Sequence, residues 1–166
     1  KKKADEEAAI AAKHAAEEAA IIKAAEAEAD QITQGLNAGG SAFILYNTIK
    51  AGKNVYVIEA LLQRGADRYI NYLVTSDETP AACAVKVGSP RTLQLLLEKG
   101  ALFHDRFHPM YEAVKAGHEN VALVLLKQPG GKYMPDGAEI IDMCKKGFIN
   151  ALRYLVEVTR TLDVNK

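Results

Sequence analysis

The stretch from Thr79 to Ala101, which reads TPAACAVKVGSPRTLQLLLEKGA, decides the fold. Thr79 is a good N-cap residue, and Pro80 suits the first position of a helix, where its missing N–H would have had no partner. We predict a helix that begins at Pro80 and ends at Gly88, which can adopt the positive φ of a helix C-terminus. Leucines at helical spacing then predict a second helix, which ends at Gly100. Such a helix pair cannot bury its apolar side alone, which is typical of stacked repeats.

The same pattern occurs three more times, in copies of decreasing quality. The clearest begins with His108-Pro109-Met110-Tyr111 and again has a glycine, Gly117, at the end of its first helix. An upstream copy surrounds Gly52, and a last copy surrounds Gly147 with Ala138-Glu139 in place of Thr-Pro. The four copies cover roughly residues 41–158.

These landmarks resemble the ankyrin repeat, whose first helix begins with Thr-Pro-Leu-His. Thr79-Pro80 and His108-Pro109-Met110-Tyr111 stand at that place, and the first and last copies are degenerate. The resemblance implies an all-α fold, an ankyrin-like helix-turn-helix solenoid over residues 42–166. It also implies a non-enzymatic module that binds another protein or peptide through its concave face. The linking segments vary in length, and only the segment from Asp67 to Glu78 is long.

Residues 1–34 differ from the repeats and consist mostly of Ala, Glu and Lys. Their composition predicts one long helix from Ala4 to Asp30, and the glycines of residues 35–41 predict a hinge into the repeats. Heptads through Ile10 and Ile21 also pass acidic positions, so a strong coiled coil is not indicated. The helix is either a solvated spacer or a packing helix in an oligomer or larger assembly. The second alternative is suggested by an alanine-rich stripe along one side of the helix.

Composition excludes several classes of partner. The 166 residues carry 21 basic and 21 acidic side chains, so nothing favours nucleic acid or an anionic membrane. The sequence has no transmembrane stretch and no signal-peptide pattern. Cys83 and Cys144 lie in different repeats and are expected to be free thiols. We therefore expect a cytoplasmic or nuclear protein.

No pattern of catalytic, cofactor or metal-binding residues emerges. His104 and His108 lack the further ligands that a zinc site needs. Gly130-Gly131-Lys132 lacks most of a phosphate-binding loop and predicts a turn. No histidine is placed by the repeat pattern to activate Cys83 as a nucleophile. We expect no cofactor, no metal and no enzyme activity.

A lysine precedes each repeat glycine by two residues, with Lys146 added in the last copy. Stacking would align these lysines as a basic row on the inner surface, suited to an acidic partner segment. Alternatively, they serve only the helix C-termini, with Glu112–Lys115 and Asp142–Lys145 pairs neutralising two of them. Aromatic residues of the long link fold back onto the repeats or form a contact patch. The predicted partner-binding residues are Lys50, Tyr69, Tyr72, Cys83, Lys86, Val87, Tyr111, Glu112, Lys115, Lys145 and Lys146.

Overall fold

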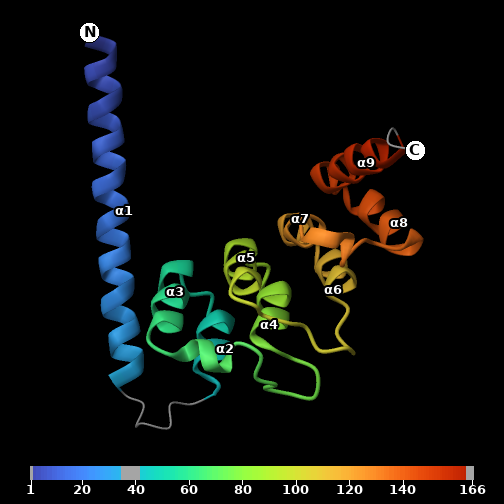
Figure 1. Cartoon of the computed structure of the whole chain (residues 1–166), viewed down its shortest axis with the longest axis horizontal. Coiled ribbons are helices and arrows are strands. Elements are labelled where there is room, and N and C mark those ends of the chain that lie inside the picture. Colours follow the sequence, from blue (N-terminus) through green and yellow to red (C-terminus); the bar gives the residue numbers. More distant parts are fainter. Residues whose placement is uncertain (1, 35–41, 164–166) are drawn as a thin grey trace.

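The computed structural model describes residues 2–34 and 42–163, and this part of the chain contains helices and no strands. A long helix, α1 (Lys2–Gln34), is followed by four pairs of shorter helices (Figure 1). The predicted hinge, residues 35–41, lies outside the described residues. The pairs are α2 (Ile44–Lys50) with α3 (Val55–Gln63), α4 (Pro80–Val87) with α5 (Pro90–Glu98), α6 (Pro109–Ala116) with α7 (Glu119–Leu126), and α8 (Gly137–Lys146) with α9 (Ile149–Asp163). Two short 3₁₀ helices, η1 (Ala66–Tyr69) and η2 (Pro129–Gly131), lie in the links.

The boundaries of α4 confirm the prediction from the Thr-Pro stretch. The Thr79 hydroxyl accepts a hydrogen bond from the Ala82 N–H at 3.3 Å, and Pro80 is the first helical residue. Gly88 ends the helix with φ of 78°. The same hydroxyl donates to the Leu102 carbonyl at 3.1 Å. The cap residue therefore also fixes the link that follows α5.

The helix pairs stack into two layers. The first helices of the pairs, α2, α4, α6 and α8, contact one another in order and form the inner layer. The second helices, α3, α5, α7 and α9, form the outer layer. Leucines such as Leu93, Leu96 and Leu125 are fully buried between the layers, whereas α4 buries alanines. These small side chains allow α4 to pack closely against its two neighbouring inner helices, α2 and α6.

Helix α8 begins earlier than the repeat pattern predicts. Alignment with the other copies places its start at Ala138-Glu139, but its N-cap is Asp136. The Asp136 carboxylate accepts from the Glu139 N–H at 2.8 Å, and the Glu139 carboxylate accepts from the Asp136 N–H at 2.9 Å. This capping box satisfies two N–H groups that the helix itself cannot, and so moves the start.

We expect Asp136→Ala to destabilise α8 by about 1 kcal/mol, because it removes the carboxylate that accepts the Glu139 N–H hydrogen bond at the start of the helix. Faster hydrogen exchange of the α8 amides would report the loss. Asp142→Ala is the matched control, since it removes a carboxylate from the same helix and breaks only an exposed pair with Lys145. Equal exchange in the two variants would contradict the capping role.

Helix α1 extends from Lys2 to Gln34, a little beyond the predicted range, and only its C-terminal part contacts the repeats. Ala25 and Ala29, from the predicted alanine stripe, are buried against Val57 and Leu61 of α3. Three polar contacts flank this patch: the Tyr56 hydroxyl donates to Glu18 at 2.7 Å, and the ion pairs Glu28–Lys53 and Asp30–Arg64 measure 2.6 and 2.7 Å. The N-terminal half projects past the repeats (Figure 1). The helix thus covers the first repeat and also extends away from it.

Candidate binding surface on the inner helices

The lysines that precede the repeat glycines all lie near the C-terminal ends of inner helices. Lys50 ends α2, Lys86 and Lys115 are the last lysines of α4 and α6, and Lys145 and Lys146 end α8. All five side chains are exposed. The inner helices are neighbours, so the lysines form a row along the inner surface, hereafter the lysine row.

Carboxylates neutralise part of the lysine row. Lys86 pairs with Glu78 at 3.2 Å, and Lys145 pairs with Asp142 at 3.2 Å, as predicted. The second predicted pair, between Glu112 and Lys115, is not formed among the described residues. Within residues 2–34 and 42–163, no ion pair joins Lys50, Lys115 or Lys146 to a carboxylate.

Aromatic rings and a carbonyl position these other lysines. The ammonium group of Lys50 lies 5.7 Å from the centre of the Tyr46 ring, and that of Lys115 lies 5.5 Å from the centre of the Tyr111 ring. Both are cation–π contacts, and in each case the lysine and the ring belong to one helix, α2 for Lys50 and α6 for Lys115. The Lys146 ammonium donates to the Lys115 carbonyl at 3.1 Å. The positive charges are therefore held near the surface without being cancelled.

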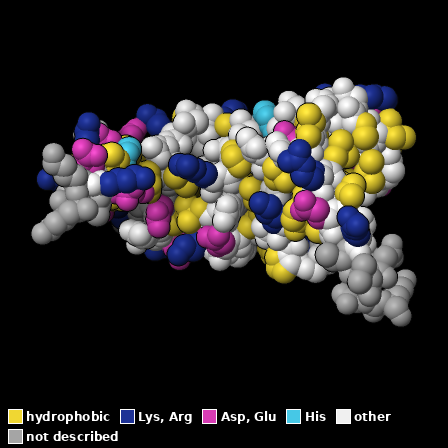
Figure 2. Space-filling model, turned by 90° about the horizontal axis from the view of Figure 1, so that it is seen from above, with side chains coloured by type: hydrophobic (Ala, Val, Ile, Leu, Met, Phe, Trp, Pro, Cys, Tyr) yellow, Lys and Arg dark blue, Asp and Glu magenta, His cyan; other side chains and the backbone are white. Residues whose placement is uncertain are grey.

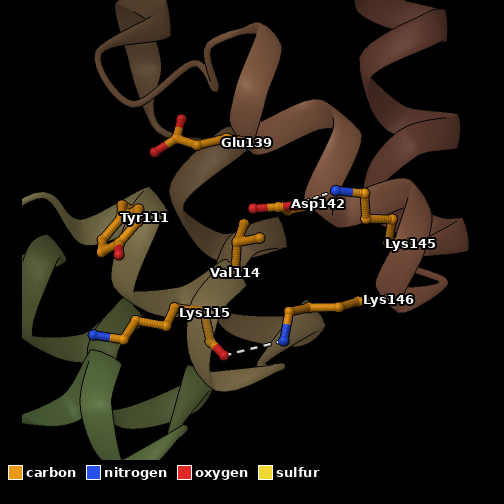
Figure 3. Close-up of a pocket in the computed structure, with 7 residues that line it drawn as sticks. All are labelled: Tyr111, Val114, Lys115, Glu139, Asp142, Lys145 and Lys146. Atoms are coloured by element: carbon orange, nitrogen blue, oxygen red, sulfur yellow. Dashed lines mark hydrogen bonds and ion pairs between the residues drawn. The ribbon is translucent and has the colours of Figure 1, made fainter.

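A groove of about 220 Å³ opens between α6 and α8. Figure 3 shows the Tyr111 ring and Val114 beside it, with Glu139 at one end and Lys115 and Lys146 at the other. A second hollow adjoins it and shares Tyr111, Glu139 and Asp142. The inner surface thus offers an exposed aromatic ring, separated charges of both signs and room for an extended segment. This combination suits recognition of a peptide.

Glu78 contacts the lysine row and is absent from the residues predicted from the sequence. Its carboxylate accepts from the Tyr46 hydroxyl at 2.8 Å and pairs with Lys86, so it ties the long link to two inner helices. Burial, followed by the hydrogen bond to Glu78, raises the pKa of Tyr46 above its ordinary value. Glu78 stands outside the repeat pattern, and no signal in the sequence pointed to it. Lys86 therefore has a structural partner.

The remaining predicted residues divide between surface and core. Val87 and Tyr72 are exposed, and Tyr69 and Glu112 are half-buried. Cys83 was predicted to lie beside the lysine row. Its side chain is instead buried in α4, at 2% exposure, and does not reach the inner surface. Burial raises the pKa of its thiol to about 11. Helix α4 lies between two other inner helices, which cover this position.

Part of the long link folds back onto the repeats, as one of the two alternatives predicts. Ile70 is buried and Val74 packs against the core. Tyr72 stays exposed, with its ring edge-on to Phe43 at 5.8 Å and to Tyr69 at 6.4 Å. The side chains left outward form a small aromatic cluster beside α2.

Residues considered for other chemistry lie in turns. His104 accepts a hydrogen bond from the Arg106 N–H at 3.3 Å, and Gly130 and Gly131 belong to η2, so the predicted turn is confirmed. In the described ranges, no group of three or more His, Cys, Asp or Glu side chains is placed to hold a metal ion. None of the described helices has the length and apolar character needed to cross a lipid bilayer.

A stack of helix pairs in two layers defines an α-solenoid of short repeats. The family model for ankyrin repeats, in three copies, matches residues 45–136, which is more than half of the chain. The chain therefore belongs to the ankyrin repeat family. The match covers the first three helix pairs and ends at the start of α8. No curated protein and no solved structure gives a significant match.

Proposed function

We propose that the chain is a non-enzymatic module that binds a protein or peptide segment through its inner surface. The observation that carries this proposal is the groove between α6 and α8, where Tyr111 is exposed beside lysines that no carboxylate neutralises. Ankyrin repeats are generally protein-interaction modules, which supports the assignment.

The charges of the groove favour a partner segment with an acidic residue. A carboxylate at this end of the groove could pair with the ammonium group of Lys115 or of Lys146, and an apolar neighbour could pack on the Tyr111 ring. Glu139 at the other end of the groove suits a donor or a basic residue of the same segment. Separated charges of this kind fix the direction in which a segment binds.

The other predicted contacts extend this site along the inner surface. Lys50 of the lysine row and exposed Val87 lie toward the first repeat. Tyr72 adds an exposed ring from the long link. Lys86 and Lys145 are already paired, so we expect them to contribute less to affinity than Lys115. Both cysteines are free, which fits a reducing compartment such as the cytoplasm or nucleus.

We expect Lys115→Glu to weaken acidic-segment binding at least about tenfold, because it reverses a charge that no neighbour screens. Random peptides selected on the immobilised wild-type chain should be enriched in Asp and Glu, and the variant should lose that enrichment. Lys127→Glu is the matched control: Lys127 also lies over a ring, that of Tyr154 at 6.0 Å, but it follows the outer helix α7. Unchanged melting temperatures would show that both variants fold. If Lys115→Glu selects the same peptides as the wild type, the proposal fails.

A second candidate function is structural, with α1 joining the chain to a larger assembly. The favouring observation is the projecting half of α1, which exposes Ile10. Removing residues 1–16, which precede the Glu18–Tyr56 hydrogen bond, would separate the two functions. Loss of assembly with peptide selection intact would support the structural function, whereas no change in assembly would leave only the inner surface.

A further inference from the structure

Helices α8 and α9 leave apolar side chains uncovered at the end of the stack. Ile149 is 63% exposed and Val156 is 64% exposed, and Ile140 and Cys144 are exposed beside them. Figure 2 shows hydrophobic side chains gathered at this end of the molecule. We call the surface formed by Ile140, Cys144, Ile149 and Val156 the end face.

Three of the four end-face residues correspond to buried apolar positions of the preceding helix pair. Gly117 and Gly147 mark equivalent points of the third and fourth pairs, so each residue of α6 and α7 corresponds to one 30 positions later. The residues equivalent to Ile140, Cys144 and Val156 are Met110, Val114 and Leu126, and all three are buried. They lie in helices that have a following pair, α8 and α9, packed against them. The end face therefore corresponds to a surface that the next helix pair covers in the third pair.

The other end of the stack cannot supply such a covering helix pair. Ala25 and Ala29 of α1 already cover Val57 and Leu61 at the outer helix of the first pair. Head-to-tail stacking of copies would require α1 to leave this position. The end face is therefore more readily covered by the same face of another copy.

Charges on α9 make such a pairing self-complementary. Arg153 and Glu157 are both exposed, and neither forms an ion pair within the described residues. An antiparallel pairing of two α9 helices, with its twofold axis near Leu155, places Arg153 of each copy opposite Glu157 of the other. A twofold interface of this kind uses each contact twice and closes at two subunits.

We propose that two copies of the chain associate end to end through α8 and α9. Helix α9 has 15 residues and is therefore about 22 Å long, and two adjacent helices are about 20 Å wide. The face offers roughly 450 Å² per copy, about half of what a standard stable interface buries. An interface of this size belongs to the weak, transient class.

Sedimentation of the full chain from about 10 μM to about 1 mM tests the association. Wild type should pass from monomer to dimer over this range. Ile149→Glu should weaken dimerisation at least about tenfold, because it places a charge at the centre of the face. The fold should tolerate it, since the equivalent residue of the third pair is Glu119. Leu102→Glu, which alters an exposed apolar residue of the α5–α6 link, should dimerise like wild type. Identical curves for all three proteins would overturn the proposal.

The charge pairing gives an independent test of the geometry. Arg153→Glu alone should weaken the dimer about tenfold, and the double exchange Arg153→Glu with Glu157→Arg should restore it. A double variant no better than the single variant would overturn the antiparallel arrangement of α9.

Discussion

Replacing Gly88 by alanine is expected to lower the free energy of unfolding by about 3 kcal/mol. Gly88 has φ of 78°, a conformation that costs a residue with a Cβ about 1 to 2 kcal/mol. A Cβ built at Gly88 also lies 2.6 Å from the Cε1 and Nδ1 atoms of the His118 ring, well inside van der Waals contact. The ring would have to move, and its 3.1 Å hydrogen bond with the Lys86 carbonyl would be lost.

Gly117→Ala separates the two causes. Gly117 ends the next inner helix with φ of 82°, but a Cβ built there meets nothing within 4 Å. Its substitution should therefore cost only the backbone term, about 1 kcal/mol. Urea unfolding followed by circular dichroism measures both variants. Placing Gly88→Ala in a His118→Ala background should reduce its cost to that of Gly117→Ala; an undiminished cost would show that the His118 ring is not responsible.

Helix boundaries were predictable where the chain itself carries the signal. Thr79 caps α4 through its own hydroxyl, and Gly88 ends it through its own conformation, so a local pattern suffices. The contact between Gly88 and His118 joins neighbouring repeats, and it became visible only when the pairs were stacked. The same holds for the Glu119 carboxylate, which accepts from the Asn150 and Ala151 N–H groups at 2.6 and 3.2 Å. The repeat pattern predicts that pairs stack, but not which polar side chains meet between them.

In the candidate site too, some features follow from the local repeat pattern and others depend on contacts between distant residues. The positions of the lysines were predictable because each precedes its repeat glycine by two residues. That spacing places every one of them near the C-terminal end of the first helix of its pair. Which lysines keep an uncancelled charge depends on carboxylates such as Glu78, which is 32 residues from Tyr46 in the chain. The register of the ankyrin repeat predicts Cys83 beside the lysine row, but packing of α4 between its neighbours buries this side chain. The alanine stripe of α1 indicated a packing helix, but only the structure identified α3 as its partner.

Ala29→Glu is expected to release α1 from α3 and to lower the free energy of unfolding by about 2 to 3 kcal/mol. Ala29 is fully buried against α3, where a carboxylate would find neither water nor a partner. The helix can instead leave α3, so the loss cannot exceed the free energy of docking. Hydrogen exchange should then become faster in α3 and in the C-terminal part of α1.

Ala27→Glu is the matched control for this substitution. Ala27 is exposed, so the variant has the same charge change and helix propensity, and we expect it to lie within about 0.5 kcal/mol of wild type. The exposed pairs Glu28–Lys53 and Asp30–Arg64 remain available in both variants and contribute little by themselves. A large effect of Ala29→Glu alone would therefore locate the docking energy in the apolar patch. Equal effects of the two variants would assign it to charge, and no effect of either would mean that α1 is a spacer that stands apart from the repeats in solution.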